Sequence, residues 1–293
     1  MKNDSFYKKL LYKFIALLPD KFFLSLKYYK NFGRFPQWNN PKTFTEKLQW
    51  LKIYNRNPLY STMVDKYDAK KYVANKIGGK YIIPTLGVWE KAEDIDFDSL
   101  PNQFVLKTTH DSGRIIICKN KSILEKENII KILNESLKRN FHAITREWPY
   151  KNVKPQIIAE KYIDNNDQDL IDYKFYCFNG VATYCQVITN RTEVETIDFF
   201  DKNWIHLNFI GLNPKARHSL KTIEKPYNYS EMLKIAESLS KNCPFLRVDL
   251  YNINGNILFG ELTFFPNSGV GKFTPKEWDW KLGELLILPK EKK

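Results

Sequence analysis

The segment 247–261, RVDLYNINGNILFGE, holds the acidic side chains with the clearest chemical potential in this sequence. Two β-rich runs flank an Asn-Gly dipeptide, which is typical of tight hairpin turns. A two-residue turn at this dipeptide would pair Asp249 with Gly260 and leave Glu261 on the opposite face. We prefer a three-residue loop at 254–256, because it pairs apolar residues with each other and sets Asp249 opposite Glu261.

Two carboxylates that face each other repel unless a cation lies between them. Asp249 and Glu261 therefore predict a Mg²⁺ site, since Mg²⁺ prefers oxygen ligands. Arg247 shares a strand face with Asp249 and would place a positive charge beside the metal. This combination suits phosphoryl or acyl-phosphate chemistry, in which negative charge develops on oxygen. An acidic hairpin with an unrelated arginine remains the alternative.

A second candidate is Lys107, which ends the apolar run 103–107 (QFVLK) just before the polar loop 108–114 (TTHDSGR). Such a turn can present an ammonium group and backbone N–H groups to a phosphate. The Walker pattern GxxxxGK[ST] is absent, and a surface hairpin would have the same appearance.

Two further predicted strands carry charged residues. Glu160 and Lys161 follow an apolar run, where they either read an adenine edge or simply emerge into solvent. On the strand 172–178 (DYKFYCF), Asp172 and Lys174 alternate onto one face. They form either a surface ion pair or contacts to a ribose hydroxyl and a phosphate.

Helices and strands must be interspersed to position these residues. Residues 64–77 and 230–242 have the spacing of helices, residues 81–83 read as a short strand, and Asn179-Gly180 favours a tight turn. No repeat or low-complexity tract interrupts the pattern. The sequence therefore predicts an α+β or α/β enzyme-like chain.

The N-terminal residues 5–30 mix lysines with aromatic and aliphatic residues at helical spacing. Pro19 should divide them into two short amphipathic helices. Their apolar faces either cover the main domain or rest on an anionic membrane surface. Thr43 and Glu46 then offer a helix cap before the apolar positions that begin at Leu48.

The composition excludes several classes of protein. The 293 residues are 43% hydrophobic, too many for a disordered chain, and no apolar run approaches the ~18–20 residues of a membrane-spanning helix. The 4 cysteines are scattered, and the 4 histidines form no HExxH pattern, so neither a disulfide scaffold nor a zinc hydrolase has support. We expect a cytoplasmic protein.

The net charge of +13 arises from 46 Lys and Arg against 33 Asp and Glu. It fits an anionic partner, such as a membrane surface or an acidic or phosphorylated substrate. The lysines are spread along the chain, and nucleic-acid-binding motifs are absent, so we expect no nucleic-acid partner.

Taken in order, these segments resemble the TupA-like branch of the ATP-grasp enzymes, which is associated with teichuronopeptide and capsular polysaccharide biosynthesis. The similarity covers roughly residues 35–270. The motifs that carry it are NPKTFTEKLQWLK (40–52), VDKYDAKKYV (64–73), YIIPTLGVW (81–89), LPNQFVLKTTHDSG (100–113), KPQIIAEKYI (154–163), DYKFYCFNG (172–180) and GELTFFPNSG (260–269).

The resemblance implies an α+β ATP-grasp fold in which two α+β subdomains clamp ATP. The expected parts are a basic helical extension (1–60), a small α/β part (61–102), a first ATP-grasp subdomain (103–163) and a second (164–293). The implied cofactors are ATP and Mg²⁺. The residues that the resemblance places around ATP are Lys66, Lys107, His110, Asp111, Ser112, Gly113, Glu160, Lys161, Tyr162, Ile163 and Asp172. In this scheme the two lysines contact phosphates, residues 108–113 cover them, residues 160–163 form the adenine hinge, and Asp172 binds ribose.

The resemblance also assigns the chemistry. The implied catalytic residues are Arg247, Lys107 and Lys174, and the implied metal ligands are Asp249, Glu261 and Asn267. Arg247 would steady the tetrahedral intermediate, as in the RxD pattern of D-alanine–D-alanine ligases. Those ligases have an ExN signature, but Thr263 stands two residues after Glu261 here. Asn267 is then the substitute ligand for a second metal ion, unless only one ion is tightly held.

The implied reaction is carboxylate–amine ligation, in which ATP activates a carboxylate as an acyl-phosphate and an amine attacks it. We expect the carboxylate to belong to a uronic acid, free, nucleotide-linked or polymeric, and the amine to be an amino acid or small amine. The alternative is a capsular glycosyltransferase, whose DxD spacing occurs within residues 94–98 (DIDFD). A catalytically silent nucleotide-binding module is a third class.

Overall fold

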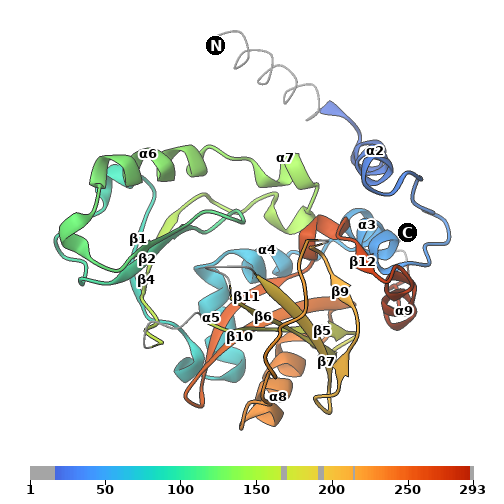
Figure 1. Ribbon diagram of the computed structural model, residues 1–293. Helices are drawn as coiled ribbons and strands as arrows, with labels where there is room; N and C mark the ends of the chain where they lie inside the picture. The colour runs from blue at the N-terminus through green and yellow to red at the C-terminus, as the bar shows by residue number, and fades with distance from the viewer. Residues whose placement is uncertain (1–16, 166–169, 191–194, 214, 291–293) are drawn as a thin grey trace.

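The computed structural model describes residues 17–165, 170–190, 195–213 and 215–290. The two main sheets have four and six strands. The helices are α2 (Asp20–Phe32), α3 (Phe44–Tyr54), α4 (Leu59–Val64), α5 (Asp68–Ile77), α6 (Lys126–Leu137), α7 (Phe141–Thr145), α8 (Tyr229–Ser240) and α9 (Glu277–Leu285). The strands are β1 (Thr85–Trp89), β2 (Phe104–Thr108), β3 (Ile115–Cys118), β4 (Ile157–Lys161), β5 (Asp172–Phe178), β6 (Val181–Thr189), β7 (Thr196–Asp201), β8 (His206–Leu207), β9 (Ile210–Gly211), β10 (Phe245–Ile253), β11 (Asn256–Thr263) and β12 (Phe273–Thr274). In Figure 1 the smaller sheet, with β1, β2 and β4, lies on the left, and the larger one lies to its right and below it.

The six-stranded sheet has the order β11-β10-β5-β6-β7-β8, and all its neighbours are antiparallel. Asn-Gly dipeptides close two of its hairpins. Asn179 and Gly180 have φ of 50° and 85°, and Asn254 and Gly255 have the same values. Both residue types tolerate this left-handed region, which two-residue hairpin turns require. The turn predicted at Asn179-Gly180 is confirmed.

Both faces of the six-stranded sheet are covered, so the main core lies in two layers. On one face the Tyr229 ring of α8 lies 5.8 Å from the Phe175 ring of β5, centroid to centroid. On the other face the Phe44 ring of α3 lies 4.9 Å from the Phe245 ring of β10. All four side chains are buried. Each such aromatic removes ~150–250 Å² from water, so these layers hold the sheet in place.

The four-stranded sheet has the order β1-β4-β2-β3 and its own smaller core. Helix α6 covers one face, where Leu133 packs with Phe104 and Leu106 (Figure 1). The strand predicted at 81–83 is wrong, because residue 81 ends a short 3-10 turn and β1 begins only at Thr85. Residue 82 forms only an isolated bridge to Phe259. The intervening proline has no N–H to donate, so the ladder with β4 starts after it.

Short helices connect the two sheets. Helix α4 contacts β11, and α5 contacts α8, whereas β1 pairs with β4 in the smaller sheet. The ATP-grasp fold expected from the sequence accordingly appears as two α+β units. The four residue ranges expected for its parts stay a prediction.

Helix α2 follows Pro19, as expected for the second of the two predicted N-terminal helices. Leu24 and Tyr28 are buried, whereas Phe22 and Tyr29 remain exposed. The first predicted helix falls largely on residues 1–16, which lie outside the described residues, and membrane contact through residues 5–30 stays a prediction. Among the helices described, none combines the length and the apolar character needed to cross a membrane.

Helix α3 begins with the capping box that the sequence predicts. The Thr43 hydroxyl accepts a hydrogen bond from the Glu46 N–H (3.3 Å), and the Glu46 carboxylate accepts one from the Thr43 N–H (3.2 Å). The buried carboxylate of Asp279 on α9 accepts from the N–H (2.9 Å) and hydroxyl (2.7 Å) of Thr45. These bonds satisfy donors at the first turn, which would otherwise be buried without partners.

We predict that Thr43→Ala lowers the free energy of unfolding by about 1 kcal/mol, because it removes the capping hydroxyl. Chemical denaturation with unchanged m-value would measure this loss. Thr43→Ser is the matched control, since it keeps the hydroxyl and should recover most of the stability. Equal destabilisation by both substitutions would show that the methyl group, and not the cap, is responsible.

Candidate functional site

The hairpin β10–β11 brings Asp249 and Glu261 into register, as the sequence predicts. The loop that does so was predicted wrongly, because Ile253 pairs with Asn256 across a two-residue turn. A bulge at Gly260 inserts the extra residue that restores the pairing of the two acids. A Cβ at Gly260 would lie 3.1 Å from the Asp249 carbonyl oxygen, so glycine suits this close approach.

The Arg247 guanidinium lies between the two carboxylates. Its Nε and Nη2 each donate to an oxygen of Asp249 at 2.7 Å, and Nη2 also reaches Glu261 Oε1 at 3.0 Å. The Thr263 hydroxyl lies 3.1 Å from both Nη2 and Glu261 Oε1. The acids thus converge on a single positive group, which removes the repulsion that facing carboxylates would suffer.

Lys174 extends this cluster from β5. Its ammonium donates to Asp249 Oδ2, the residue directly opposite it across the ladder, and lies 3.6 Å from Asp172 Oδ1. Burial alone would raise the pKa of Asp249, but Arg247 and Lys174 outweigh it and hold that pKa below its ordinary value. Two cations among three carboxylates leave the group, here called the acidic cluster, with one net negative charge.

The acidic cluster fits a Mg²⁺ ion by its donor chemistry. Arg247 and Lys174 fill three of the roughly four lone-pair sites of the Asp249 carboxylate. Glu261 is 44% exposed at its side chain, so it can turn an oxygen toward a ligand arriving from solvent. Hard carboxylate oxygens, together with one net negative charge, match what Mg²⁺ requires.

Lys107 and Glu160 meet on the face of the four-stranded sheet opposite to the one that α6 covers. Glu160 Oε2 lies 2.5 Å from the Lys107 ammonium, and Oε1 lies 2.6 Å from that of Lys70. Burial of Glu160 opposes its charge, but the two lysines hold its pKa below the ordinary value. Two ammonium groups and one carboxylate leave this basic cluster with one net positive charge, which suits a phosphate.

Lys70, which binds the Glu160 carboxylate, was missed by sequence reasoning. Lys70 lies four residues after Lys66, a spacing that could have drawn attention to it. The Glu160 carboxylate is occupied by lysines, and the Lys161 N–H donates to the Pro84 carbonyl at 3.0 Å. The adenine-hinge role expected for residues 160–163 stays a prediction.

Lys66 interacts electrostatically with a member of each cluster, Glu261 and Lys107. The helix predicted over 64–77 is interrupted, because Asp65 Oδ1 accepts from the N–H groups of residues 67 (2.8 Å) and 68 (2.9 Å) and starts a new helix. Lys66 therefore sits in a turn, where its ammonium donates to the carbonyls of Thr108 (3.0 Å) and Asp111. Burial lowers the pKa of Lys66, whereas the negative charges of Glu261 and Asp111 act to raise it. This ammonium group therefore interacts with acidic residues from both sheets.

The loop after β2 divides into an inward and an outward part. His110 and Asp111 are buried, and Asp111 accepts from the Thr108 hydroxyl and from Arg139 at 2.9 Å. Burial lowers the pKa of His110. These two residues therefore shape the loop, whereas Ser112 and Gly113 are exposed and can face a ligand.

Asn267 lies in the turn Pro266–Gly269 after β11, with φ of 45°. Its side-chain amide donates to the Leu212 carbonyl at 3.0 Å. The turn is held from α3, because Gln49 donates to Gly269 O at 2.7 Å and Lys52 to Ser268 O at 2.9 Å. A metal-binding role for Asn267 stays a prediction, and the buried lysine of α3 is a contact that sequence reasoning missed.

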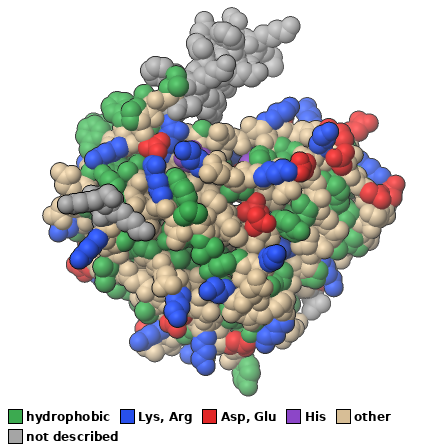
Figure 2. Space-filling model, turned by 180° about the vertical axis from the view of Figure 1, so that it is seen from behind, with side chains coloured by type: hydrophobic (Ala, Val, Ile, Leu, Met, Phe, Trp, Pro, Cys, Tyr) green, Lys and Arg blue, Asp and Glu red, His purple; other side chains and the backbone are tan. Residues whose placement is uncertain are grey.

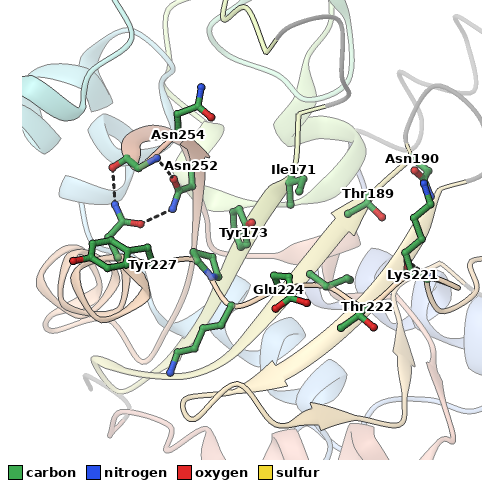
Figure 3. A pocket seen from close by; sticks show the side chains of 16 residues that line it. Ile171, Tyr173, Thr189, Asn190, Lys221, Thr222, Glu224, Tyr227, Asn252 and Asn254 are labelled. Carbon is green, nitrogen blue, oxygen red and sulfur yellow. Dashed lines mark hydrogen bonds between the residues drawn. The ribbon is translucent and has the colours of Figure 1, made fainter.

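A cavity of about 440 Å³ opens elsewhere, beside β5, β6 and the hairpin tip (Figure 3). Tyr173, Thr189, Lys221 and Asn254 are among its lining residues, and none of the predicted site residues is. The acids of the alternative DxD site make local contacts instead, since Asp98 pairs with Lys126 at 2.8 Å.

Comparison with known proteins identifies the family. The family model of the TupA-like ATP-grasp proteins matches residues 46–287. A comparison with curated proteins gave no match. Similar solved structures include a Bacillus anthracis D-alanine–D-alanine ligase complexed with ATP (18% identity, TM-score 0.40, covering 69% of this chain and 55% of that chain). They also include a Bacillus licheniformis L-amino acid ligase (10% identity, TM-score 0.46, covering 92% of this chain and 62% of that chain). A third is the ATP-grasp ligase PsnB, complexed with minimal precursor, Mg and ADP (12% identity, TM-score 0.38, covering 75% of this chain and 57% of that chain).

The chain spans about half the length of the first of these structures, at 55%. The family model, by contrast, covers most of the present chain and includes both charged clusters. The chain therefore belongs to the TupA-like ATP-grasp family and has the ATP-grasp fold.

Proposed function

We propose that this protein activates the carboxylate of a sugar acid with ATP and joins it to an amine through an amide bond. The observation that carries the proposal is the convergence of Asp249 and Glu261 on Arg247. Lys66 interacts electrostatically with Glu261 of this acidic cluster and with Lys107 of the basic cluster. A net negative group beside a net positive one is complementary to a metal–polyphosphate ligand, in which cation and anion lie side by side.

Each charged residue then has a defined task. Lys66 and Lys107 hold phosphate oxygens, with Lys70 keeping Glu160 neutralised when Lys107 turns to the ligand. Asp249 and Glu261 hold Mg²⁺, which when bound neutralises phosphate charge. Arg247 stays near the reacting carboxylate and stabilises the negative charge that develops when the amine attacks the acyl-phosphate.

Lys174 is a positioning residue in this scheme. Its bond to Asp249 lets the buried carboxylate keep its charge and orientation for the metal. Ser112 and Gly113, exposed on the loop after β2, supply N–H groups to phosphate. Asp172, Tyr162 and Ile163 remain our candidates for ribose and adenine contacts.

The proposed acid substrate is a uronic acid, free, nucleotide-linked or within a capsular or other cell-surface polysaccharide. Its support is the resemblance to this branch of the family and the net charge of +13. Lys and Arg side chains are scattered over the face shown in Figure 2, among neutral and hydrophobic ones. Such a distribution attracts a polyanion without forming a nucleic-acid groove. A cytoplasmic location is part of the same proposal.

The first test measures ADP released from ATP and Mg²⁺ in the presence of pooled uronic acids and amines. We expect ADP only when both an acid and an amine are supplied, because the amine must complete the turnover. Cleavage of a nucleotide sugar without ADP formation would instead support the glycosyltransferase alternative.

We predict that Asp249→Asn lowers ADP formation by at least ~100-fold, since it removes the charge that holds both Mg²⁺ and Arg247. Glu261→Gln should have a similar effect. Because the Glu261 side chain is 44% exposed, this variant should fold, and its thermal unfolding would verify that. Asp98→Asn is the matched control, because it lies outside the acidic cluster. Loss of activity in the control, with activity retained in the other two, would refute the metal assignment.

We predict that Lys107→Ala raises the Kd for ATP about 10–100-fold, the effect of losing one hydrogen bond to a charged group. Glu160 keeps Lys70 as its partner, so the fold should persist. Isothermal titration with ATP and with adenosine would separate phosphate from base recognition, since adenosine affinity should not change. Lys126→Ala serves as the control, and an unaltered ATP affinity in Lys107→Ala would reject the phosphate contact.

A further inference from the structure

Two histidines and an aspartate that are far apart in the sequence meet at the end of the six-stranded sheet. Asp198 Oδ1 lies 2.8 Å from His206 Nε2 and 2.9 Å from His218 Nδ1. The three candidate ligand atoms all lie within 4.8 Å of one another. Asp198 is only 3% exposed, whereas the side chains of His206 and His218 are 42% and 29% exposed. The group is therefore anchored inside and open to solvent on one side.

Local structure brings the three residues together. Asp201 Oδ1 accepts from the N–H groups of residues 203 and 205, both at 2.8 Å, and closes the tight turn between β7 and β8. This turn pairs His206 with Phe200, on the same strand face as Asp198. On the other side, the Ile197 N–H donates to the Arg217 carbonyl at 3.0 Å, which places His218 beside Asp198.

The aspartate is also oriented by a backbone donor. The Ser219 N–H donates to Asp198 Oδ2 at 3.0 Å, so Oδ1 is the oxygen turned toward both imidazoles. Second bonds of this kind commonly orient metal-binding carboxylates. In a tetrahedral zinc site with bonds of ~2.0–2.1 Å, neighbouring ligand atoms stand ~3.3 Å apart. Small side-chain rotations would open the present separations to that value.

We propose that Asp198, His206 and His218 bind a divalent transition-metal cation such as Zn²⁺, with water as the fourth ligand. Two imidazole nitrogens and one carboxylate oxygen favour Zn²⁺ over Mg²⁺, which takes oxygen ligands. When the metal binds, the two imidazole nitrogens that face Asp198 must be unprotonated. The competing explanation is a hydrogen-bonded ion pair between the aspartate and protonated histidines.

This site is separate from the one proposed for Mg²⁺. Across the ladders Asp198 aligns with Val187 and Tyr173, whereas Lys174 is the next residue along β5 and points to the opposite face. A bound ion would join β7, the two-residue edge strand β8 and the segment at 218. Such a cross-link would hold the edge strand in place, so its expected effect is on stability and not on ATP chemistry.

The test uses the full chain, stripped with a chelator and titrated with Zn²⁺ in excess Mg²⁺, which occupies oxygen sites. We expect one Zn²⁺ per chain, a higher midpoint of thermal unfolding, and d–d absorption of tetrahedral type when Co²⁺ replaces Zn²⁺. His206→Gln and His218→Gln should each weaken Zn²⁺ binding by at least ~100-fold, more than the loss of a second-shell partner. His142→Gln, a histidine on α7, is the matched control and should bind normally.

Two outcomes would overturn the proposal. Unchanged Zn²⁺ affinity in both His206→Gln and His218→Gln would place the ion elsewhere. Absence of Zn²⁺ uptake by the unsubstituted chain would leave a hydrogen-bonded cluster only. Because the His206 side chain is partly exposed, His206→Gln should fold, and the thermal midpoints without metal would verify that.

Discussion

The burial of Arg247 against two carboxylates is the constraint on which the candidate site depends. A guanidinium removed from water is tolerated only when anions and hydrogen-bond acceptors surround it. Asp249 and Glu261 meet that requirement, and they reinforce it, because both act to raise the pKa of Arg247 against the effect of burial. The hairpin, its bulge at Gly260 and the neighbouring Lys174 can all be understood as the structure that this buried charge needs.

Buried charges are paired in the same way in two clusters, which have net charges of opposite sign. The basic cluster stands on the four-stranded sheet, and the acidic cluster stands on the six-stranded sheet. The Lys66 ammonium donates a hydrogen bond to the Thr108 carbonyl in the smaller sheet and interacts electrostatically with Glu261 in the larger sheet. The two clusters are therefore complementary in charge to a ligand that carries both phosphate and a metal ion.

The structural role of helix α3 follows from its contacts. Gln49 and Lys52 donate to carbonyl groups of the turn that follows β11, and burial lowers the pKa of Lys52. Asp279 of α9 holds the first turn of the same helix at Thr45. The segment before the two sheets therefore supports the turn that follows the β10–β11 hairpin.

Much of this arrangement followed from the sequence alone, because hairpins, caps and alternating strands are local patterns. The facing of Asp249 and Glu261, the cap at Thr43 and the strand position of Lys107 needed only neighbouring residues. Even there, matching apolar residues across the hairpin predicted a three-residue loop, whereas the turn has two residues. The extra residue is taken up by the bulge at Gly260, which the spacing of residue types does not reveal.

Tertiary structure decided which charges neutralise each other. Two lysines from different elements pair with the Glu160 carboxylate, and the sequence pattern indicated neither pairing. Asp198, His206 and His218 have no motif spacing, and only the β7–β8 turn and a bridge to residue 217 bring them together. Sequence patterns indicate which residues are neighbours along one strand, helix or turn. The partner of a buried charge depends on the tertiary structure, because a charge removed from water is strongly destabilising unless an opposite charge lies beside it.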